Sequence, residues 1–438
     1  MNNQNNEANN KESIEVKKNN RDRFFRWNFI MGLINGILFQ GARAFTSSNI
    51  VIPLFLDNFH LSRVFIGLFS SIFGHHGGGI AGGIPQLFVA NKLENKPRKK
   101  PTLIWAITIR TLCWGSLAFI TYFFASRYPQ FTVWYLMGIL LVFTFMGGVE
   151  KVPLMDIWGK AIPGTYRGRF FGHRQFWGSL LAIGTGYLAK VILSSETIQF
   201  PNNFALLFLL AFIFMGAGYL ALGAVVEPVE EVHKDILPLK DFFRKTLSIV
   251  KKDKNYRNYL IVQFLSAFNA LALTFYVLYG KDNFNISPTL AGQFIVAQMV
   301  GGAVSNLFWA HLADRIRNKK VIIINIFTSI LVPLLALLIT HENIKLFISA
   351  YFLIGFSIAG LRIGLNNFLL DISPSKNRVT YISIAGTLKM PTMFFPLIGG
   401  TIAQYSSYKT LFITTIIFLG IGLISSLALK DPNIKEEG

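Results

Sequence analysis

Apolar residues recur along this chain in long runs that are separated by short polar stretches. About 20 residues of α-helix rise about 30 Å, which is the thickness of the hydrocarbon layer of a bilayer. The runs cover residues 28–55, 64–89, 102–123, 132–159, 176–192, 204–225, 259–279, 290–310, 321–339, 346–370, 380–402 and 410–428. This pattern predicts twelve transmembrane helices.

A basic polar segment separates the first six apolar runs from the last six. The predicted organisation is a disordered cytoplasmic tail, a six-helix bundle, a cytoplasmic linker, a second six-helix bundle and a second cytoplasmic tail. Their boundaries are 1–26, 27–225, 226–257, 258–429 and 430–438. The tail at residues 1–26 is rich in Asn and Lys and lacks the short apolar core of a secretory signal.

The positions of the basic residues predict the orientation in the membrane. Of 42 Lys and Arg residues, six fall inside the predicted helices and five in the odd-numbered connections, and the rest fall in the tails and the even-numbered connections. Cytoplasmic loops retain Lys and Arg, so both termini are predicted to be cytoplasmic. The net charge of +20 therefore indicates membrane orientation and contact with lipid headgroups, and we expect no nucleic-acid partner.

Composition agrees with a membrane protein and gives no sign of an enzyme. Hydrophobic residues make up 52% of the chain and charged residues 15%, whereas about 25% is usual for soluble proteins. Cys113, the single cysteine, allows neither an intrachain disulfide nor a cysteine metal cluster. The sequence has no Gly-rich nucleotide loop and no HExxH motif. We expect no catalytic residue, no metal and no cofactor.

The two halves of the chain repeat one another. After the second predicted helix the chain reads LFVANKLENKPRKK, and after the eighth it reads LFWAHLADRIRNKK. The turns after helices four and ten share the pattern P-x-x-x-R, at Pro163 to Arg167 and at Pro374 to Arg378. Internal repeats of this kind are typical of secondary transporters.

With this repeat, the chain resembles the major facilitator superfamily, which has a G-x-L-A-D-R-x-G-R-K turn after helices two and eight. The second copy here contains Leu312-Ala313-Asp314-Arg315 but has Ala310, Arg317 and Asn318 where the family has Gly, Gly and Arg. The first copy keeps Glu94 as its acid. The resemblance implies an all-α integral membrane protein with twelve transmembrane helices in two pseudo-symmetric six-helix bundles.

The resemblance also implies alternating access around a central site lined mainly by helices one, four, seven and ten. Asp314 would belong to a cytoplasmic gate, where an acid can hold arginines of the other bundle. The predicted gating residues are Asp314, Arg315, Glu94, Arg167 and Arg378.

Charged residues inside the predicted helices are the candidates for substrate binding, because each is costly in a bilayer. Superposing the two P-x-x-x-R turns aligns Lys151 with Arg362, each twelve residues before its proline. Arg43 shares a helical face with Gln40. The predicted substrate-binding residues are Arg43, Lys151, Arg362, Gln40, Asn269 and Asn366.

A structural role for these cations remains an alternative. Lys151 and Arg362 could instead form ion pairs that fix helix packing, with Glu150, Asp156 or Asp371 as the acid. Glu150 is also a candidate to carry a coupling proton.

These features predict a secondary active transporter for a small anionic metabolite, coupled to an ion such as the proton or to a solute gradient. One alternative is a carrier of a neutral sugar-like or amphipathic drug-like compound. Helix five lacks the proline of the drug-antiporter pattern G-x-x-x-G-P-x-x-G-G, which weakens proton-coupled drug export. A non-transporting membrane receptor is a further alternative. We expect a monomer in the lipid bilayer of a bacterial cytoplasmic (inner) membrane, with a small-molecule substrate as its partner.

Overall fold

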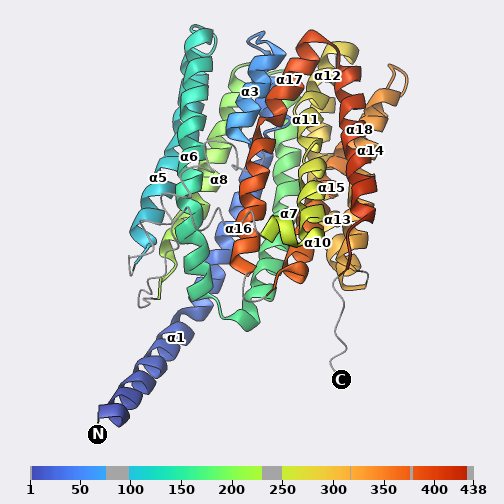
Figure 1. The fold of residues 1–438 in the computed structure, drawn as a ribbon. Coiled ribbons are helices and arrows are strands. Elements are labelled where there is room, and N and C mark those ends of the chain that lie inside the picture. Colours follow the sequence, from blue (N-terminus) through green and yellow to red (C-terminus); the bar gives the residue numbers. More distant parts are fainter. Residues whose placement is uncertain (1, 75–97, 229–248, 316, 375–377, 432–438) are drawn as a thin grey trace.

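The computed structural model describes the chain except for residues 1, 75–97, 229–248, 316, 375–377 and 432–438. Within helices, the side chains of residues 2–23, 164, 307, 310, 313–315, 378–380 and 383 also lie outside the description. The described residues form helices and connecting turns, without a strand. The helices run roughly alongside one another, and both ends of the chain lie at the same end of the bundle (Figure 1). The opposite end is called the outer end below.

The first half of the chain contains seven described helices. They are α1 (Asn2–Phe45), α2 (Val51–Asp57), α3 (Arg63–Phe73), α5 (Lys100–Phe124), α6 (Pro129–Ala161), α7 (Gly164–Leu193) and α8 (Asn202–Ala224). Helix α1 packs against α7 and α8, and α5 packs against α6 and α8. Because α1 begins at Asn2, residues 2–26 continue a helix where the sequence predicted a disordered tail. Glu and Lys in this stretch are good helix formers and can extend a helix that is already nucleated.

The second half has the same kind of packing. Its helices are α10 (Lys254–Ser266), α11 (Asn269–Leu273), α12 (Phe275–Phe284), α13 (Pro288–Arg315), α14 (Asn318–Leu338), η2 (Ile344–Leu346), α15 (Phe347–Ile372), α16 (Arg378–Lys389), η4 (Met390–Phe394), α17 (Phe395–Tyr405) and α18 (Tyr408–Leu427). Helix α13 packs against α15, and α14 packs against α15 and α18.

Three of the predicted spans are broken into shorter helices. Residues 28–55 divide into α1 and α2, residues 259–279 fall in α10 to α12, and residues 380–402 divide among α16, η4 and α17. Pro391 lies in the last break, and proline removes a backbone donor from the helix. Hydropathy predicts where a segment spans, but not where its hydrogen-bond ladder is interrupted.

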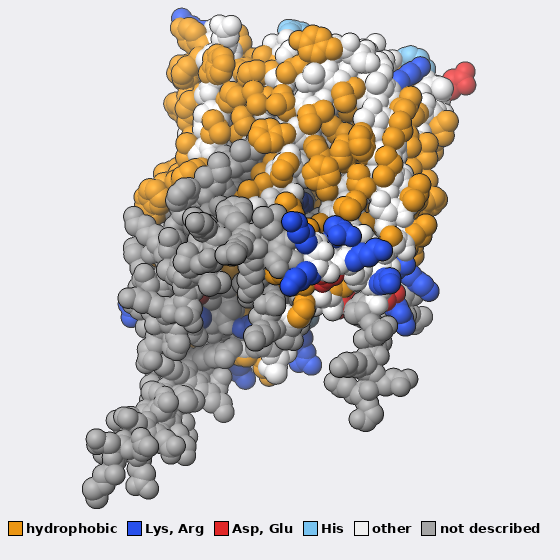
Figure 2. All heavy atoms as spheres, viewed as in Figure 1, with side chains coloured by type: hydrophobic (Ala, Val, Ile, Leu, Met, Phe, Trp, Pro, Cys, Tyr) orange, Lys and Arg blue, Asp and Glu red, His pale blue; other side chains and the backbone are white. Residues whose placement is uncertain are grey.

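Eight of the described helical segments are long and apolar enough to cross a membrane. They are Lys100–Phe124, Pro129–Ala161, Thr165–Leu193, Asn202–Ala224, Lys254–Phe284, Asn318–Leu338, Ile344–Ile372 and Tyr408–Leu427. Hydrophobic side chains cover the upper part of the face in Figure 2, and Lys and Arg side chains gather below them, toward the chain ends. The protein is therefore an all-α integral membrane protein. A count of twelve spans remains a prediction, because the second predicted span falls partly within residues 75–97.

The two halves contact each other through α7 with α13 and through α3 with α17. Small residues let these helices approach closely. A Cβ atom on Gly67 of α3 would lie 2.4 Å from the carbonyl oxygen of Pro396. A Cβ atom on Gly400 of α17 would lie 2.4 Å from the carbonyl oxygen of Arg63. The halves thus enclose the space between them on two sides.

Candidate functional site

A polar cavity of about 100 Å³ lies between the two halves. Helices α1 and α7 form its wall on the N-terminal side, and α13 and α15 form its wall on the C-terminal side. Its polar lining residues are Gln40, Arg43, Gln175, Ser179, Gln298, Asn306 and Arg362. The remaining lining residues are small or aliphatic: Ala182, Met299, Gly302, Ala303, Gly355, Ile358 and Ala359. No aromatic residue of the described chain lines this cavity.

A chain of hydrogen bonds orders the wall formed by α1 and α7. Arg43 donates from Nη1 to Oε1 of Gln40 at 2.9 Å. Gln40 donates to Oε1 of Gln175 at 3.1 Å, and Gln175 donates to the hydroxyl of Ser179 at 3.4 Å. Gly178 makes this contact possible, because a Cβ atom there would lie 2.9 Å from Cγ of Gln40. The amides thereby fix the position of the Arg43 guanidinium.

Arg362 of α15 supplies a second guanidinium on the opposite wall. Arg43 and Arg362 line the same small cavity, so their positive charges repel each other. The acids proposed from the sequence as structural partners of Arg362 contact other residues, as described below. Two converging cations in a confined polar space favour an anion, because a negative charge between them turns repulsion into attraction.

A buried amide pair closes the cavity toward the outer end. Asn49, just after α1, donates from Nδ2 to Oε1 of Gln298 on α13 at 3.0 Å, and the reverse bond measures 3.4 Å. Both side chains are at most 9% exposed. This pair joins the two halves directly above the cavity.

The structure brings only part of the predicted binding set to the cavity. Arg43, Arg362 and Gln40 line it, whereas Lys151, Asn269 and Asn366 do not. Asn269 is buried in α11, which packs on α17 and α18. Lys151 and Asn366 are exposed on α6 and α15. Equal spacing from a proline places Lys151 and Arg362 at corresponding heights in the repeat, but it does not fix which way each helix face points.

The sequence analysis did not identify four of the polar residues that line the cavity: Gln175, Ser179, Gln298 and Asn306. Each is a polar residue within a predicted or nearly adjoining apolar run, and Gln175 and Ser179 are spaced by one helical turn. The described cavity is lined by predicted helices one, five, eight and ten, rather than by one, four, seven and ten. Helices α7 and α13 line it because they cross at the contact between the halves.

Glu150 lies in a buried ion pair within the N-terminal half. Its carboxylate contacts the Arg110 guanidinium, and it also accepts a hydrogen bond from the Tyr219 hydroxyl at 3.1 Å. The side chains of Arg110 and Glu150 are 7% and 6% exposed. Arg110 also lies over the ring of Phe143, with Cζ 4.1 Å from the ring centroid. Glu150 thus joins α6 to α5 and α8, and its candidate role in carrying a proton stays a prediction.

The other two acids considered as partners of Lys151 and Arg362 also contact different residues. Asp156 pairs with Lys99 at 2.7 Å and with Lys160 at 2.6 Å. Asp371 accepts a hydrogen bond from Nδ2 of Asn318 at 2.6 Å. The hypothesis that Glu150, Asp156 or Asp371 neutralises Lys151 or Arg362 therefore has no contact to support it.

Comparison with known proteins relates this architecture to a family. The model of the Major Facilitator Superfamily matches residues 259–438, which contain the whole C-terminal half with Arg362. Solved structures of transporters share the fold over more than nine tenths of the chain. The C-terminal part of the chain therefore matches the Major Facilitator Superfamily in sequence, and the whole architecture matches solved transporters in fold.

The proteins that this chain is similar to differ in what they are named to transport. The chain is 25% identical over 397 residues to the "Multi-drug resistance efflux pump PmrA homolog" of Lactococcus lactis subsp. lactis (strain IL1403), covering 84% of this chain and 90% of the relative. A D-xylose-proton symporter has a TM-score of 0.67 at 14% identity, over 93% of this chain and 97% of its own. The nucleoside transporter NupG has a TM-score of 0.60 at 13% identity, over 93% and 98%. The two structures support the fold and leave the substrate class undetermined.

Most of the predicted gating residues lie outside the described part. These are Glu94 and the side chains of Asp314, Arg315 and Arg378. Arg167 is described, and its guanidinium donates to the carbonyl oxygens of Gly159 and Ile162 at the end of α6. Cations at such positions satisfy the last carbonyls of a helix. A gating role for Arg167 remains a prediction.

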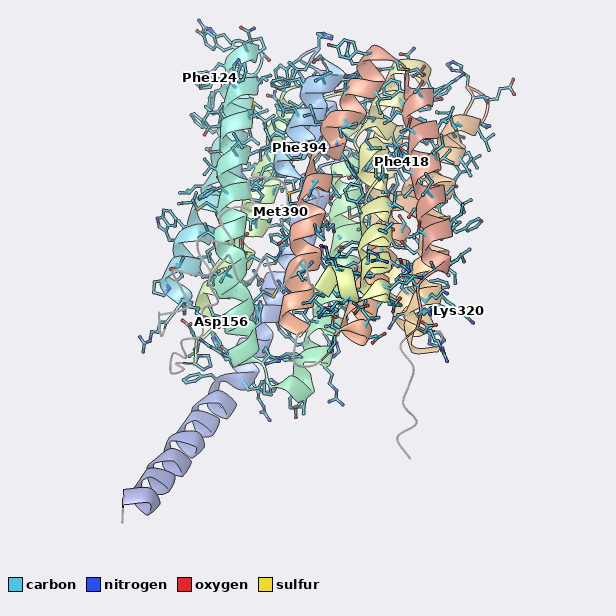
Figure 3. The ribbon with its side chains drawn as sticks, in the orientation of Figure 1. Phe124, Asp156, Lys320, Met390, Phe394 and Phe418 are labelled. Atoms are coloured by element: carbon cyan, nitrogen blue, oxygen red, sulfur yellow. The ribbon has the colours of Figure 1, made fainter. Side chains whose placement is uncertain are left out.

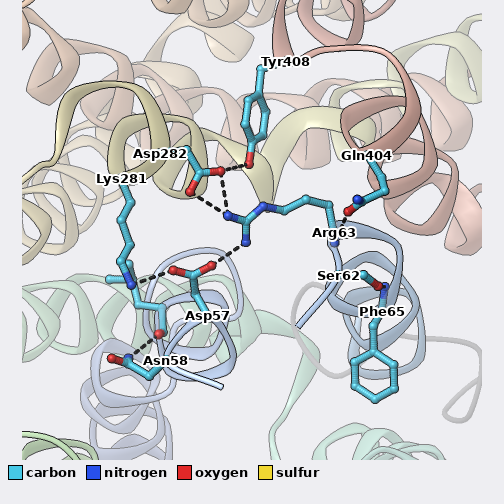
Figure 4. A network of polar contacts seen from close by, with 10 residues as sticks. Asp57, Asn58, Ser62, Arg63, Phe65, Lys281, Asp282, Gln404 and Tyr408 are labelled. Carbon is cyan, nitrogen blue, oxygen red and sulfur yellow. Dashed lines mark hydrogen bonds and ion pairs between the residues drawn. The ribbon is translucent and has the colours of Figure 1, made fainter. Parts of the chain in front are cut away.

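An ion-pair network joins the two halves at the outer end (Figure 4). Asp57 of the N-terminal half pairs with Arg63 and, at 2.6 Å, with Lys281 of the C-terminal half. Arg63 also contacts both carboxylate oxygens of Asp282 at 2.6 Å. The Tyr408 hydroxyl donates to Asp282 at 2.5 Å. These five residues, Asp57, Arg63, Lys281, Asp282 and Tyr408, are called the outer network.

The outer network was missed from the sequence although the repeat contained a signal for it. The tripeptide Asp-Asn-Phe occurs at 57–59 after the first span and again at 282–284 after the seventh. Repeated acids at equivalent turns of two pseudo-symmetric halves come together where the halves meet. The comparison of cytoplasmic turns alone could not find them.

Removing the charge of Asp57 is expected to loosen the outer end. Burial raises the pKa of Asp57, but hydrogen bonds from Lys281 and Arg63 outweigh it and lower the pKa below the ordinary value. The network is therefore complete above about pH 3.9, the usual Asp pKa, and weakens only as the pH falls through the lowered pKa. Over the neutral range we expect no change in the accessibility of the cavity.

The measurement is the labelling of a cysteine at Ala303, which lines the cavity, by a membrane-impermeant maleimide added from the outer side to a Cys113→Ser background. Asp57→Asn should raise the labelling rate about tenfold, equivalent to about 1.4 kcal/mol of lost coupling between the halves. Glu342→Gln changes a charge in another outer-end connection and serves as the matched control. Equal labelling rates in Asp57→Asn and Glu342→Gln would show that the network does not hold the outer end closed.

Proposed function

We propose that this transporter carries a small anionic metabolite, whose acidic group binds between Arg43 and Arg362. The observation that supports this proposal is the convergence of two guanidinium groups from opposite halves on one polar cavity. Arginine presents a planar set of donors that suits carboxylate and phosphate oxygens. An anion bound there would offset the repulsion between the two cations.

The amides around the two arginines favour a substrate that also carries hydroxyl or amide groups. Gln175 and Ser179 on α7 and Asn306 on α13 offer donors and acceptors around the bound anion. Asn306 donates from its amide nitrogen to the carbonyl oxygen of Gly302 at 2.7 Å. A short hydroxylated organic acid or a phosphorylated compound matches this chemistry.

Alternating access would use the same two walls. The anion would contact Arg43 in one half and Arg362 in the other, so its binding would couple the positions of the halves. The outer network and the Asn49–Gln298 pair hold the outer side closed, so the cavity in this conformation would exchange with the side of the chain termini. The driving force would come from an ion or solute gradient.

A second candidate is the export of amphipathic drug-like compounds. It is favoured by the relationship to a protein named as a multi-drug resistance efflux pump. Such compounds are usually bound by apolar and aromatic surfaces, and the described lining of this cavity has no aromatic residue. The polar lining therefore favours the anion.

A thermal-shift screen of the purified protein in detergent distinguishes the two candidates. Wild type is compared with an Arg43→Gln/Arg362→Gln variant against organic acids, phosphorylated sugars, neutral sugars and lipophilic cations. A ligand at 100 times its Kd stabilises the folded state by about 2.7 kcal/mol. We expect anions to stabilise wild type and not the double variant.

Arg127→Gln is the control, since Arg127 is exposed near the outer end and stacks on Tyr128. It should keep the full response to anions. Stabilisation of wild type and the double variant alike by lipophilic cations, with no response to anions, would replace the proposal with drug export.

A further inference from the structure

A strongly basic surface lies on the C-terminal half, at the end of the bundle that carries the chain termini. Helices α10 and α14 begin there, and α18, which packs against both, ends there. Figure 2 shows Lys and Arg side chains gathered below the apolar band, and Figure 3 places Lys320 at the same end of the bundle. The exposed cations, called the basic surface below, are Lys251, Lys252, Lys254, Arg257, Arg317, Lys320 and Lys430.

Hydrogen bonds join α10 and α14 to the same short segment at the end of α18. Asn255 of α10 and the backbone of Lys430 exchange two hydrogen bonds, of 2.7 and 2.8 Å. On the other side, Lys319 of α14 donates from Nζ to the carbonyl oxygen of Leu427 at 2.8 Å. The first turns of both helices therefore meet within one helical turn of chain, which gathers the cations of the basic surface around the end of α18.

The acids that adjoin the basic surface are few. Asp253 and Asp431 are the acids next to its cations in the sequence. Asp253 caps the N-terminus of α10, and Asp431 pairs with Arg317 at 3.6 Å. Asp371, at the end of α15, accepts a hydrogen bond from Asn318 at 2.6 Å. Within the described residues, the remaining cations of the basic surface form no ion pair with an acid.

The corresponding junction of the N-terminal half supplies its own acids. Lys99, the counterpart of Lys319 in the repeat, pairs with Asp156 at 2.7 Å. The backbone nitrogen of Lys99 also donates to Glu227 at 2.8 Å. The position that matches Asp156 in the C-terminal half, seven residues before the proline of the turn, is Asn367. The C-terminal junction thus lacks the carboxylate that neutralises its counterpart.

Exposed apolar side chains continue from the basic surface into the membrane-spanning part of the same helices. On α14, the exposed Ile324 and Phe327 follow Lys320 at spacings of one and two helical turns. On α18, the side chains of Ile424 and Leu427 are exposed close to the end of the helix. A phospholipid has the same order of chemistry, with a charged headgroup at the membrane surface and acyl chains beneath it. A soluble anion would use only the charged end.

We infer that the basic surface binds the headgroup of an anionic phospholipid, whose acyl chains pack on α14 and α18. Clusters of Lys and Arg at a membrane surface attract anionic lipids, and both side chains donate well to phosphate oxygens. The phosphate supplies the counter-charge that the N-terminal half supplies for itself. It thereby holds the beginnings of α10 and α14 to the end of α18. No residue of the basic surface lines the cavity between Arg43 and Arg362, so the lipid site does not depend on the proposed function.

The test compares phosphatidylglycerol with phosphatidylcholine of the same acyl chains, each added to delipidated full-length protein in a neutral detergent. The readout is the apparent affinity from the rise in melting temperature with lipid concentration. Wild type should bind phosphatidylglycerol about tenfold more tightly, since each cation near a membrane surface adds to the attraction. Lys254→Gln/Arg257→Gln/Lys320→Gln should lose this preference. Without lipid, this variant should melt no lower than wild type, because its substituted side chains are exposed and a repulsion between cations has been removed.

Arg26→Gln/Arg98→Gln/Arg169→Gln is the matched control, since it removes three exposed cations of the N-terminal half toward the same end of the molecule. It should keep the preference for phosphatidylglycerol. An unchanged preference in the C-terminal triple variant would overturn the inference, and an equal loss in both triple variants would replace it with a general attraction to charge. Stabilisation of wild type by glycerol phosphate as strong as that by phosphatidylglycerol would also overturn it, because a soluble anion would then suffice.

Discussion

Replacing Glu150 with Gln is expected to lower the free energy of unfolding by about 3–5 kcal/mol, because Arg110 would keep its buried charge and lose its carboxylate. Both side chains are almost fully buried, so water cannot compensate for the loss. The measurement is denaturant-induced unfolding in detergent micelles. Tyr219→Phe removes only a hydrogen bond to the same carboxylate and should cost about 1 kcal/mol.

An Arg110→Met/Glu150→Gln variant tests the physical reason for this loss. Removing both charges leaves no unpaired ion, so this variant should be more stable than Glu150→Gln alone. The alternative is that Glu150 carries a coupling proton. In that case Glu150→Gln would unfold like wild type and still exchange substrate, but it would no longer accumulate substrate against a gradient.

Replacing Gly355 with Ala is expected to damage both stability and transport. The new Cβ atom would lie 2.0 Å from the backbone oxygen of Gln298 and 2.9 Å from the backbone nitrogen of Gly302. These contacts are between backbones, so the two helices α13 and α15 must separate. Overpacking of this kind typically costs about 1–3 kcal/mol. The shift would move Gln298 away from Asn49 and change the cavity beside Arg362, so we expect transport to fall at least tenfold.

Gly420→Ala in α18 provides the matched control. A Cβ atom at Gly420 meets nothing within 4 Å, and Ala favours a helix over Gly by about 1 kcal/mol in itself. This variant should therefore be at least as stable as wild type and as active. Equal transport and equal unfolding in the two variants would mean that the close approach of α13 and α15 does not shape the site.

The sequence predicted the features that depend on composition along the chain. The apolar runs predicted the all-helical membrane fold, and the repeated turns indicated the superfamily. Arg43, Gln40 and Arg362 were predicted from their cost in a bilayer, and the structure places them at one cavity. The free-energy cost of a charged side chain in the bilayer indicates that the residue has a structural or functional role. This cost can be judged from the sequence without any knowledge of helix packing.

The features that depend on the direction of each helix face could not be predicted in the same way. Lys151 aligns with Arg362 in the repeat, yet it does not line the cavity that Arg362 lines. Helix α6 contains Pro153 close to Lys151, and a proline can change the direction of the helix beyond it. The partner of Gln175 depends on how closely α7 approaches α1, and the partner of Gln298 depends on how closely α13 approaches the segment after α1. Small residues at several helix contacts determine the positions of these helices, so no single sequence motif predicts the positions.

Counterflow in proteoliposomes tests the central claim most directly. Vesicles are loaded with the anion that most stabilises the purified protein, and the uptake of the labelled anion is followed with no ion gradient. Wild type and Arg127→Gln are expected to exchange the anion, and Arg43→Gln/Arg362→Gln is expected to lose at least 99% of that exchange, about 2.7 kcal/mol of binding energy. Exchange by the double variant at the rate of wild type would contradict a substrate site between the two arginines.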